Sequence, residues 1–180
     1  LLERFNRLAA LGGSAAGFLV AIYTGLLISA APAISFWNTP ALPLLFVISA
    51  FSTGAAFLLL LSTFSKNEGA HSISEKLEQL DAGLIVTELI ILGAYFNFAF
   101  FLPTGARASA EELFQTPFFV FGFMVAGLLV PLAIETYSIF FSKHSKQSAG
   151  VMIAASLLVL LGGFLLRYYV LHAGLYQYPW

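Results

Sequence analysis

The chain has 180 residues, of which 59% are hydrophobic and 9% are charged, and its formal net charge is −1. An average soluble domain is about 45–50% apolar and about 25% charged, so this chain carries more apolar surface than a soluble interior can hide. The weak net charge and the lack of a basic patch exclude a nucleic-acid-binding protein. The composition therefore predicts an integral membrane protein.

Five stretches are long enough to cross about 30 Å of hydrocarbon, which takes about 20 helical residues. They are residues 8–30, 43–64, 80–102, 118–141 and 149–172. Short connections rich in proline, glycine or polar residues separate them. Because no repeat or low-complexity linker divides the chain, we expect one all-α transmembrane domain over residues 1–180.

Basic residues fall mainly on one side of these spans. Arg107 is alone in the connections of one side, whereas six basic residues lie on the other. The six are Arg4, Arg7, Lys66, Lys76, Lys143 and Lys146. Because Lys and Arg resist translocation, we expect the N-terminus in the cytoplasm and the C-terminus outside. Trp37 and the aromatic residues of 176–180 would then lie at the outer interface, where such rings are favoured.

A GxxxG pair, Gly13 and Gly17, lies in the first span, with Gly25 two turns further along. Small residues at this spacing let helix backbones approach closely in lipid. We therefore expect this stretch to pack against another helix.

The sequence contains no cysteine. Thiolates hold iron–sulfur clusters and attach c-type haem, so any redox centre must come from a partner subunit or a diffusible carrier. A b-type haem usually needs two histidines at matched depth, but His71 and His144 lie in predicted connections and only His172 is near a span. We therefore expect neither haem nor a metal site. The chain starts at Leu1 in a charged segment, so we interpret it as a piece of a longer polypeptide.

Three ionisable residues lie in the interior of the predicted spans, away from their ends: Glu88, Glu135 and Arg167. Such a group costs on the order of 2.5–3.5 kcal/mol at the bilayer centre, so each requires a partner or a function. Asp81, Glu88 and Tyr95 are spaced by seven, which places them on one helical face. Together with Glu135, this face predicts a proton pathway. The alternative, equally open, is that Glu88 or Glu135 is a hydrogen-bonded packing residue or a partner of Arg167.

A second set of polar residues falls in the outer third of the membrane. Tyr23, Asn97 and Arg167 lie at similar predicted depth, so a phenol, an amide and a guanidinium could bind the oxygens of a quinone head group. Tyr168 and His172 are four residues apart on one helical face and could donate protons near the outer surface. The alternative for His172 is an ordinary interfacial residue.

Several segments resemble the NrfD/PsrC family of respiratory membrane subunits, which serve polysulfide reductase, the nitrite reductase quinol-oxidising module and related complexes. These segments are residues 23–27 (YTGLL), 36–40 (FWNTP), 43–50 (PLLFVISA), 52–56 (STGAA) and 162–174 (GGFLLRYYVLHAG). The resemblance covers nearly all of the chain. It implies an eight-helix fold of two four-helix bundles in a prokaryotic cytoplasmic membrane, with this chain as the last five helices.

The resemblance also implies a site for menaquinone or ubiquinone near the outer surface, and no haem. A four-cluster iron–sulfur protein would dock on that side and connect to a catalytic subunit of molybdopterin or cytochrome type. By the match at the YTG motif, Tyr23 would contact quinone, and Arg167 would belong to the site or to a proton route. Because the family's first helices also contribute to the quinone site, no complete active site is expected in this chain alone.

The sequence thus predicts a quinone- or quinol-interacting membrane subunit of a respiratory oxidoreductase, with iron–sulfur clusters only in a partner. Its candidate catalytic residues are Tyr23, Arg167 and His172, and Asn97 and Tyr168 would help to bind quinone. Two alternatives stay open. One is half of an ion-coupled secondary transporter, which would have paired helix interruptions near the midplane. The other is a purely structural membrane anchor.

Overall fold

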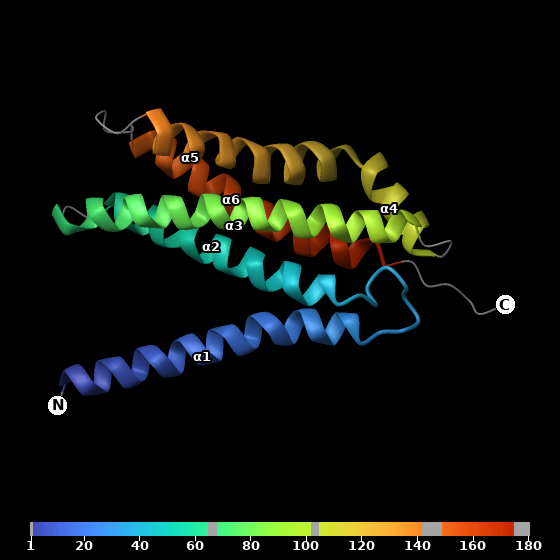
Figure 1. Cartoon of the computed structure of the whole chain (residues 1–180), viewed down its shortest axis with the longest axis horizontal. Coiled ribbons are helices and arrows are strands. Elements are labelled where there is room, and N and C mark those ends of the chain that lie inside the picture. The colour runs from blue at the N-terminus through green and yellow to red at the C-terminus, as the bar shows by residue number, and fades with distance from the viewer. Residues whose placement is uncertain (1, 65–67, 102–104, 142–148, 175–180) are drawn as a thin grey trace.

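The structure, a computed structural model, describes residues 2–64, 68–101, 105–141 and 149–174 (Figure 1). These residues are mostly helical, and no strand occurs among them. The helices in chain order are α1 (Leu2–Ser29), α2 (Ala41–Phe64), α3 (Glu68–Phe101), α4 (Gly105–Gln115), the π-helix η1 (Phe118–Leu129), α5 (Val130–Phe141) and α6 (Ala149–His172). Lys66, Lys143, Lys146, His144 and the aromatic residues of 176–180, which entered the predictions above, lie outside the described residues.

Within the described part of the chain, five helical stretches are long and apolar enough to cross a membrane. They are Arg4–Ser29, Ala41–Phe64, Ile73–Phe101, Phe118–Phe140 and Ala149–His172. The fourth combines η1 and α5, which follow each other without a break. The predicted all-α fold with five spans is confirmed, and the chain is a multi-pass membrane protein.

Two helical segments extend beyond the predicted spans. Helix α3 begins at Glu68 rather than near residue 80, because hydropathy marks where the membrane begins and not where the helix does. Helix α4 occupies a stretch that the sequence suggested was only a connection. It buries Ala106, Ala110 and Leu113 on one face and carries an exposed Arg107–Glu111 ion pair on another. Such a pair at i,i+4 supports a short surface helix.

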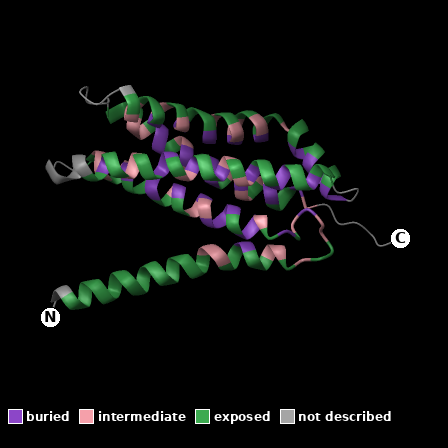
Figure 2. Ribbon diagram, in the orientation of Figure 1, coloured by how far each residue is buried: buried purple, intermediate pink, exposed green. Residues whose placement is uncertain are grey.

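The helices α2, α3, η1–α5 and α6 pack together, whereas α1 diverges from them toward the N-terminus (Figure 1). Residues 4–20 of α1 are exposed throughout, as Figure 2 shows. A Cβ added at Gly13 or Gly17 would meet no atom of another helix within 4 Å, so the close helix approach expected for this pair is absent from the described structure. Gly25 makes the approach instead, because a Cβ there would lie 2.5 Å from the Cα of Pro43.

One end of the bundle carries α4, the connection 30–40 and the C-terminal end of α6, and we call it the α4 end; the opposite end is the far end (Figure 1). Two long-range hydrogen bonds fix the connection at the α4 end. The Tyr95 hydroxyl donates to the carbonyl oxygen of Phe36 at 2.7 Å, and Trp37 Nε1 donates to the carbonyl oxygen of Val170 at 2.8 Å. The connection is thereby attached to both α3 and α6.

The fourth span packs against α6 through two glycines. A Cβ on Gly127 would lie 2.6 Å from Gly162 Cα, so only residues without a side chain allow this approach. Pro131 is the second residue of α5, just after the π-helical segment, yet the helix continues through it. Because a proline lacks an N–H, the change from π to α geometry at this point accommodates the missing donor. The paired helix interruptions that a transporter half would need are not found in the described spans.

Candidate functional site

Buried polar side chains lie in a row between the helices, which we call the buried polar line. Its members come from α2, α3, α5 and α6: Ser49, Ser52, Asp81, Glu88, Glu135 and Arg167. All are buried except Arg167, which is half-buried. Because α2 and α3 run in opposite directions, Ser52 lies beside Asp81 while Ser49 lies beside Glu88. Asp81 and Glu88 are seven residues apart, about 10 Å along the helix axis.

Asp81 is the most enclosed member of the line, with no exposed surface. Ser52 Oγ donates a hydrogen bond to Asp81 Oδ1 at 2.7 Å. The Glu135 carboxyl of α5 lies close enough to the Asp81 carboxyl to interact with it directly. Asp81 Oδ2 and Glu135 Oε2 have no hydrogen-bond partner within the described part of the chain. A single proton between the two carboxyl groups would satisfy both oxygens and remove the repulsion of two adjacent negative charges.

Glu88 lies deeper along α3, beside Ser49 of α2. Arg167 of α6 attracts it electrostatically, but no ion pair within 4.0 Å joins them in the described structure. Arg167 Nη1 instead donates to the carbonyl oxygen of Gly163 at 2.7 Å, and its guanidinium carbon lies 5.6 Å from the centre of the Phe46 ring. Glu88 is therefore the carboxyl that faces Arg167, whereas Glu135 faces Asp81.

Gly163 makes room for this part of the line. A Cβ at this position would lie 3.4 Å from Arg167 Nη1 and 3.5 Å from Ser49 Oγ, and it would collide with the methyl group of Thr53. Ser49 Oγ is buried without a hydrogen-bond partner among the described residues. The Ser49 hydroxyl thus lies beside the Glu88 carboxyl and near the Arg167 guanidinium. Any residue larger than glycine at position 163 would fill this space.

The line reaches toward the far end through a residue that the sequence did not single out. Glu78 lies one turn before Asp81 on α3, and Ser138 Oγ of α5 donates to Glu78 Oε2 at 3.0 Å. A cavity of about 10 Å³ is lined by Glu78, Glu135 and Ser156 together with apolar residues. This is close to the space that one water molecule occupies. Glu78 lies three residues before Asp81, and this spacing on one helical face is the sequence signal that could have identified Glu78 as a site residue.

Tyr95 completes the predicted face of α3, because it is buried like Asp81 and Glu88. Its hydroxyl proton is directed to the carbonyl oxygen of Phe36. The Tyr95 phenol therefore has a structural contact at the α4 end.

The three residues predicted to converge on a quinone lie on different surfaces. Tyr23 is 60% exposed on α1, Asn97 is exposed on α3, and Arg167 points toward α2. No hydrogen bond or ion pair between described residues links them. Tyr23 lines a shallow, almost wholly apolar hollow with other side chains of α1: Leu19, Val20, Ile22 and Leu26. A phenol donor on an apolar wall fits one side of a site for a quinone ring, and in the described chain that wall comes from α1 alone.

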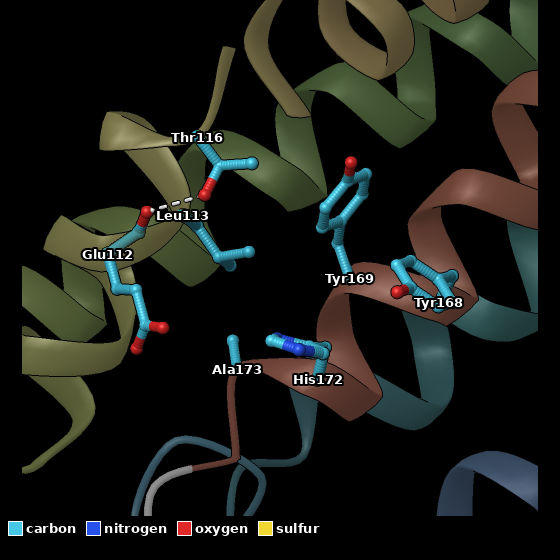
Figure 3. A pocket seen from close by; sticks show the side chains of 7 residues that line it. All are labelled: Glu112, Leu113, Thr116, Tyr168, Tyr169, His172 and Ala173. Carbon is cyan, nitrogen blue, oxygen red and sulfur yellow. Dashed lines mark hydrogen bonds between the residues drawn. The ribbon is translucent and has the colours of Figure 1, made fainter. Parts of the chain in front are cut away.

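Tyr168 and His172 belong to a pocket at the α4 end, shown in Figure 3. Its volume is about 120 Å³. The lining residues come from α4, the following turn and the end of α6: Glu112, Leu113, Thr116, Tyr168, Tyr169, His172 and Ala173. The rings of Tyr168 and His172 are stacked with their centres 6.0 Å apart. Asn97 and Arg167 do not line this pocket.

Glu112 was not predicted as a site residue. Its neighbour Glu111 forms an ion pair with Arg107 at 2.8 Å, while Glu112 is one of the residues that line the pocket. The i,i+4 spacing of Arg107 and Glu111 was visible in the sequence, but the pocket was not, because α4 was not predicted as a helix.

Comparison with known proteins gives a consistent assignment. The family profile described as "Polysulphide reductase, NrfD" matches residues 2–179. The chain is 31% identical over 156 residues to the protein NrfD homolog of Haemophilus influenzae, covering 84% of this chain and 48% of that protein. It is 30% identical over 163 residues to protein NrfD of Escherichia coli, covering 87% and 49%. It is also 30% identical over 161 residues to the C subunit of the polysulfide reductase of Wolinella succinogenes, covering 86% and 50%.

The chain thus spans about half the length of the curated relatives it matches. No solved structure matches it. The resemblance seen at the YTGLL, FWNTP and GGFLLRYYVLHAG segments is confirmed by these matches, which extend over nearly the whole sequence. The chain belongs to the polysulphide reductase NrfD family.

Proposed function

We propose that the chain is part of the membrane subunit of a respiratory oxidoreductase, where it interacts with quinone or quinol and handles the coupled protons. Family membership and the similarity to one subunit of a polysulfide reductase support a membrane subunit of a larger reductase. The buried polar line carries the proposal for protons. Burying several carboxyl groups and a guanidinium in a membrane interior is costly, and such residues mark ion and proton routes.

The line would conduct protons from the far end toward the middle of the membrane. Glu78 and the one-water cavity are the entry, and Asp81 with Glu135 is the first station. Ser52 and Ser49 are hydroxyl groups that can accept one proton while donating another. Glu88, which faces Arg167, is the deepest acid, and Tyr95 lies beyond it on the same helical face.

The basic residues support a direction for this route. Arg4, Arg7 and Lys76 lie toward the far end, whereas Arg107 lies at the α4 end. By the positive-inside rule the far end, with the N-terminus of this chain, would face the cytoplasm. The α4 end and the C-terminus would then face outward, and protons would enter from the cytoplasm.

Quinone, either menaquinone or ubiquinone, would bind against α1. When bound, it supplies the chemistry of a carrier of two electrons and two protons. The Tyr23 hydroxyl would donate to a head-group oxygen, while Leu19 and Leu26 would contact the ring. Asn97, Arg167 and Tyr168 remain proposed members of the quinone site. His172, with Tyr168, would donate or accept protons at the α4 end.

The electrons would pass to or from a four-cluster iron–sulfur protein docked on the outward face. This chain contains no cysteine, so the clusters would belong to that partner. The partner would connect to a catalytic subunit of molybdopterin or cytochrome type. In this arrangement the membrane subunit binds, orients and handles protons, while cofactors elsewhere carry the electrons.

Copurification tests the proposal directly. The full-length chain is isolated with its partners in mild detergent, and quinone and iron are quantified per complex. We expect bound quinone in the preparation, iron in a copurified subunit, and quinol-dependent turnover that quinone-site inhibitors block. A pure, active complex without quinone, and with turnover that such inhibitors leave unchanged, would contradict it.

A further inference from the structure

The residues that line the pocket at the α4 end favour a positively charged ligand. It combines one carboxylate, Glu112, with the aromatic rings of Tyr168, Tyr169 and His172, as Figure 3 shows. None of its seven lining residues is Lys or Arg. Carboxylates and the faces of aromatic rings both attract cations, whereas an anion would find no permanent positive charge here.

Glu112 is available for such a cation. Its neighbour Glu111 is occupied by Arg107 at 2.8 Å, but no hydrogen bond or ion pair of the described residues involves the Glu112 carboxylate. Only its backbone carbonyl oxygen is used, as the acceptor for the Thr116 hydroxyl at 3.0 Å. The two adjacent acids therefore differ: Glu111 pairs with Arg107 of its own helix, and Glu112 lines the pocket.

The size of the pocket restricts the ligand to a small group. Its volume is about 120 Å³. Sites for complete drug-sized ligands or cofactors measure about 300–1,000 Å³. A substituted ammonium group fits this space, together with the carbon atoms next to it.

The pocket also lies where a lipid head group would be. It opens next to the surface helix α4, where the fourth span begins and α6 ends. Below it, α6 presents an exposed apolar stripe at helical spacing: Leu157, Leu161, Phe164 and Tyr168. The rings of Phe164 and Tyr168 stack with centres 6.3 Å apart, and His172 continues the stack into the pocket. An acyl chain lying along this stripe would end with its head group at the pocket.

We propose that this pocket binds the ammonium head group of a zwitterionic phospholipid such as phosphatidylethanolamine, with an acyl chain along the α6 stripe. Glu112 supplies the charge, and the rings of Tyr168 and His172 supply the aromatic walls. The site does not depend on the proposed quinone function. Tyr168 and His172 are also the proposed outer proton donors, but the lipid site is tested by measuring bound lipid and not turnover.

Lipid occupancy tests the proposal in the full-length chain within its intact complex. The delipidated complex is mixed with dioleoyl phosphatidylethanolamine or dioleoyl phosphatidylglycerol, and bound lipid is counted by native mass spectrometry. We expect phosphatidylethanolamine to be preferred by about threefold or more, the scale of exposed cation–π contacts. Glu112→Gln should abolish the preference, whereas the matched control Glu111→Gln should keep it. An unchanged preference in Glu112→Gln, or none in the native protein, would overturn the site.

Further experiments test whether the Tyr168 ring is needed and whether the ammonium group comes from a membrane lipid. Tyr168→Phe keeps the ring and should keep the preference, whereas Tyr168→Leu should lose it. Glycerophosphoethanolamine has the head group without acyl chains, so it should not compete at lipid concentrations; equal competition would overturn a membrane source. Zero-length carbodiimide coupling of Glu112 to a lysine of a copurified subunit would also overturn the lipid site. The pocket would then be occupied by a protein side chain.

Discussion

Ser52 on α2 donates a 2.7 Å hydrogen bond to the carboxyl of Asp81 on α3, and both side chains are buried among the membrane spans. The two residues are 29 apart in the sequence and lie on antiparallel helices. Their bond fixes the position of α2 along α3. It also holds Oδ1 of Asp81 in place, while the Asp81 carboxyl interacts with that of Glu135.

Replacing Ser52 by alanine should therefore affect both stability and proton handling. The Asp81 oxygen would lose its only donor in the described structure, which costs about 1–3 kcal/mol for a buried polar group. Thermal unfolding of the full-length chain in detergent should shift to lower temperature. The control is Ser14→Ala, whose hydroxyl bonds to the Ala10 carbonyl on the exposed face of α1 and should matter little. Equal unfolding temperatures for both variants would contradict the assigned role.

Tyr23→Phe should slow quinol-linked turnover while the complex still assembles. The substitution removes a hydroxyl from an exposed apolar wall, so the loss would be a hydrogen bond to the quinone, worth about 0.5–1.5 kcal/mol or about tenfold at most. Steady-state quinol oxidation measures it. Tyr137→Phe is the matched control, because Tyr137 is 62% exposed on another span and Tyr23 is 60% exposed. Unchanged kinetics in Tyr23→Phe would remove Tyr23 from the quinone site.

Gly162→Ala should destabilise the contact between α6 and the fourth span. The added Cβ would lie 2.8 Å from Gly127 Cα and 2.9 Å from its carbonyl oxygen, and backbone atoms cannot move aside as a flexible side chain can. Overpacking of this kind costs about 1–3 kcal/mol. Gly93→Ala is the control, because nothing lies within 4 Å of a Cβ there and alanine favours the helix. A Gly162→Ala protein that melts at or above the native temperature would show that the helices are further apart.

The spans could be predicted from the sequence because lipid imposes a length and an apolar composition on every crossing segment. The face of α3 that carries Asp81, Glu88 and Tyr95 could also be predicted, since a spacing of seven returns to one side of a helix. All three are buried. Helix α4 could not be predicted from hydropathy, because a short amphipathic helix at the surface has no apolar run of spanning length.

Contacts between residues on different helices could not be predicted from the sequence. Depth along a span could be counted for Tyr23, Asn97 and Arg167, but equal depth does not say which way each side chain turns around its helix axis. The contact of Ser52 with Asp81, the pairing of Asp81 with Glu135, and the position of Glu112 depend on how the helices are rotated against one another. Packing sets these rotations, and in lipid small residues such as Gly127 and Gly162 contribute most to it.

The central claim is that the buried polar line carries the protons coupled to quinone turnover. Proton uptake during quinol-driven turnover in proteoliposomes tests it, with Glu88→Gln as the variant and Glu111→Gln as the control. Glu88 is buried and is the deepest acid of the line, whereas Glu111 is an exposed partner of Arg107. We predict that Glu88→Gln lowers the uptake rate by about a hundredfold, the lower range for a lost acid–base group, while Glu111→Gln matches the native rate. Native uptake in Glu88→Gln would contradict the account and favour a purely structural anchor.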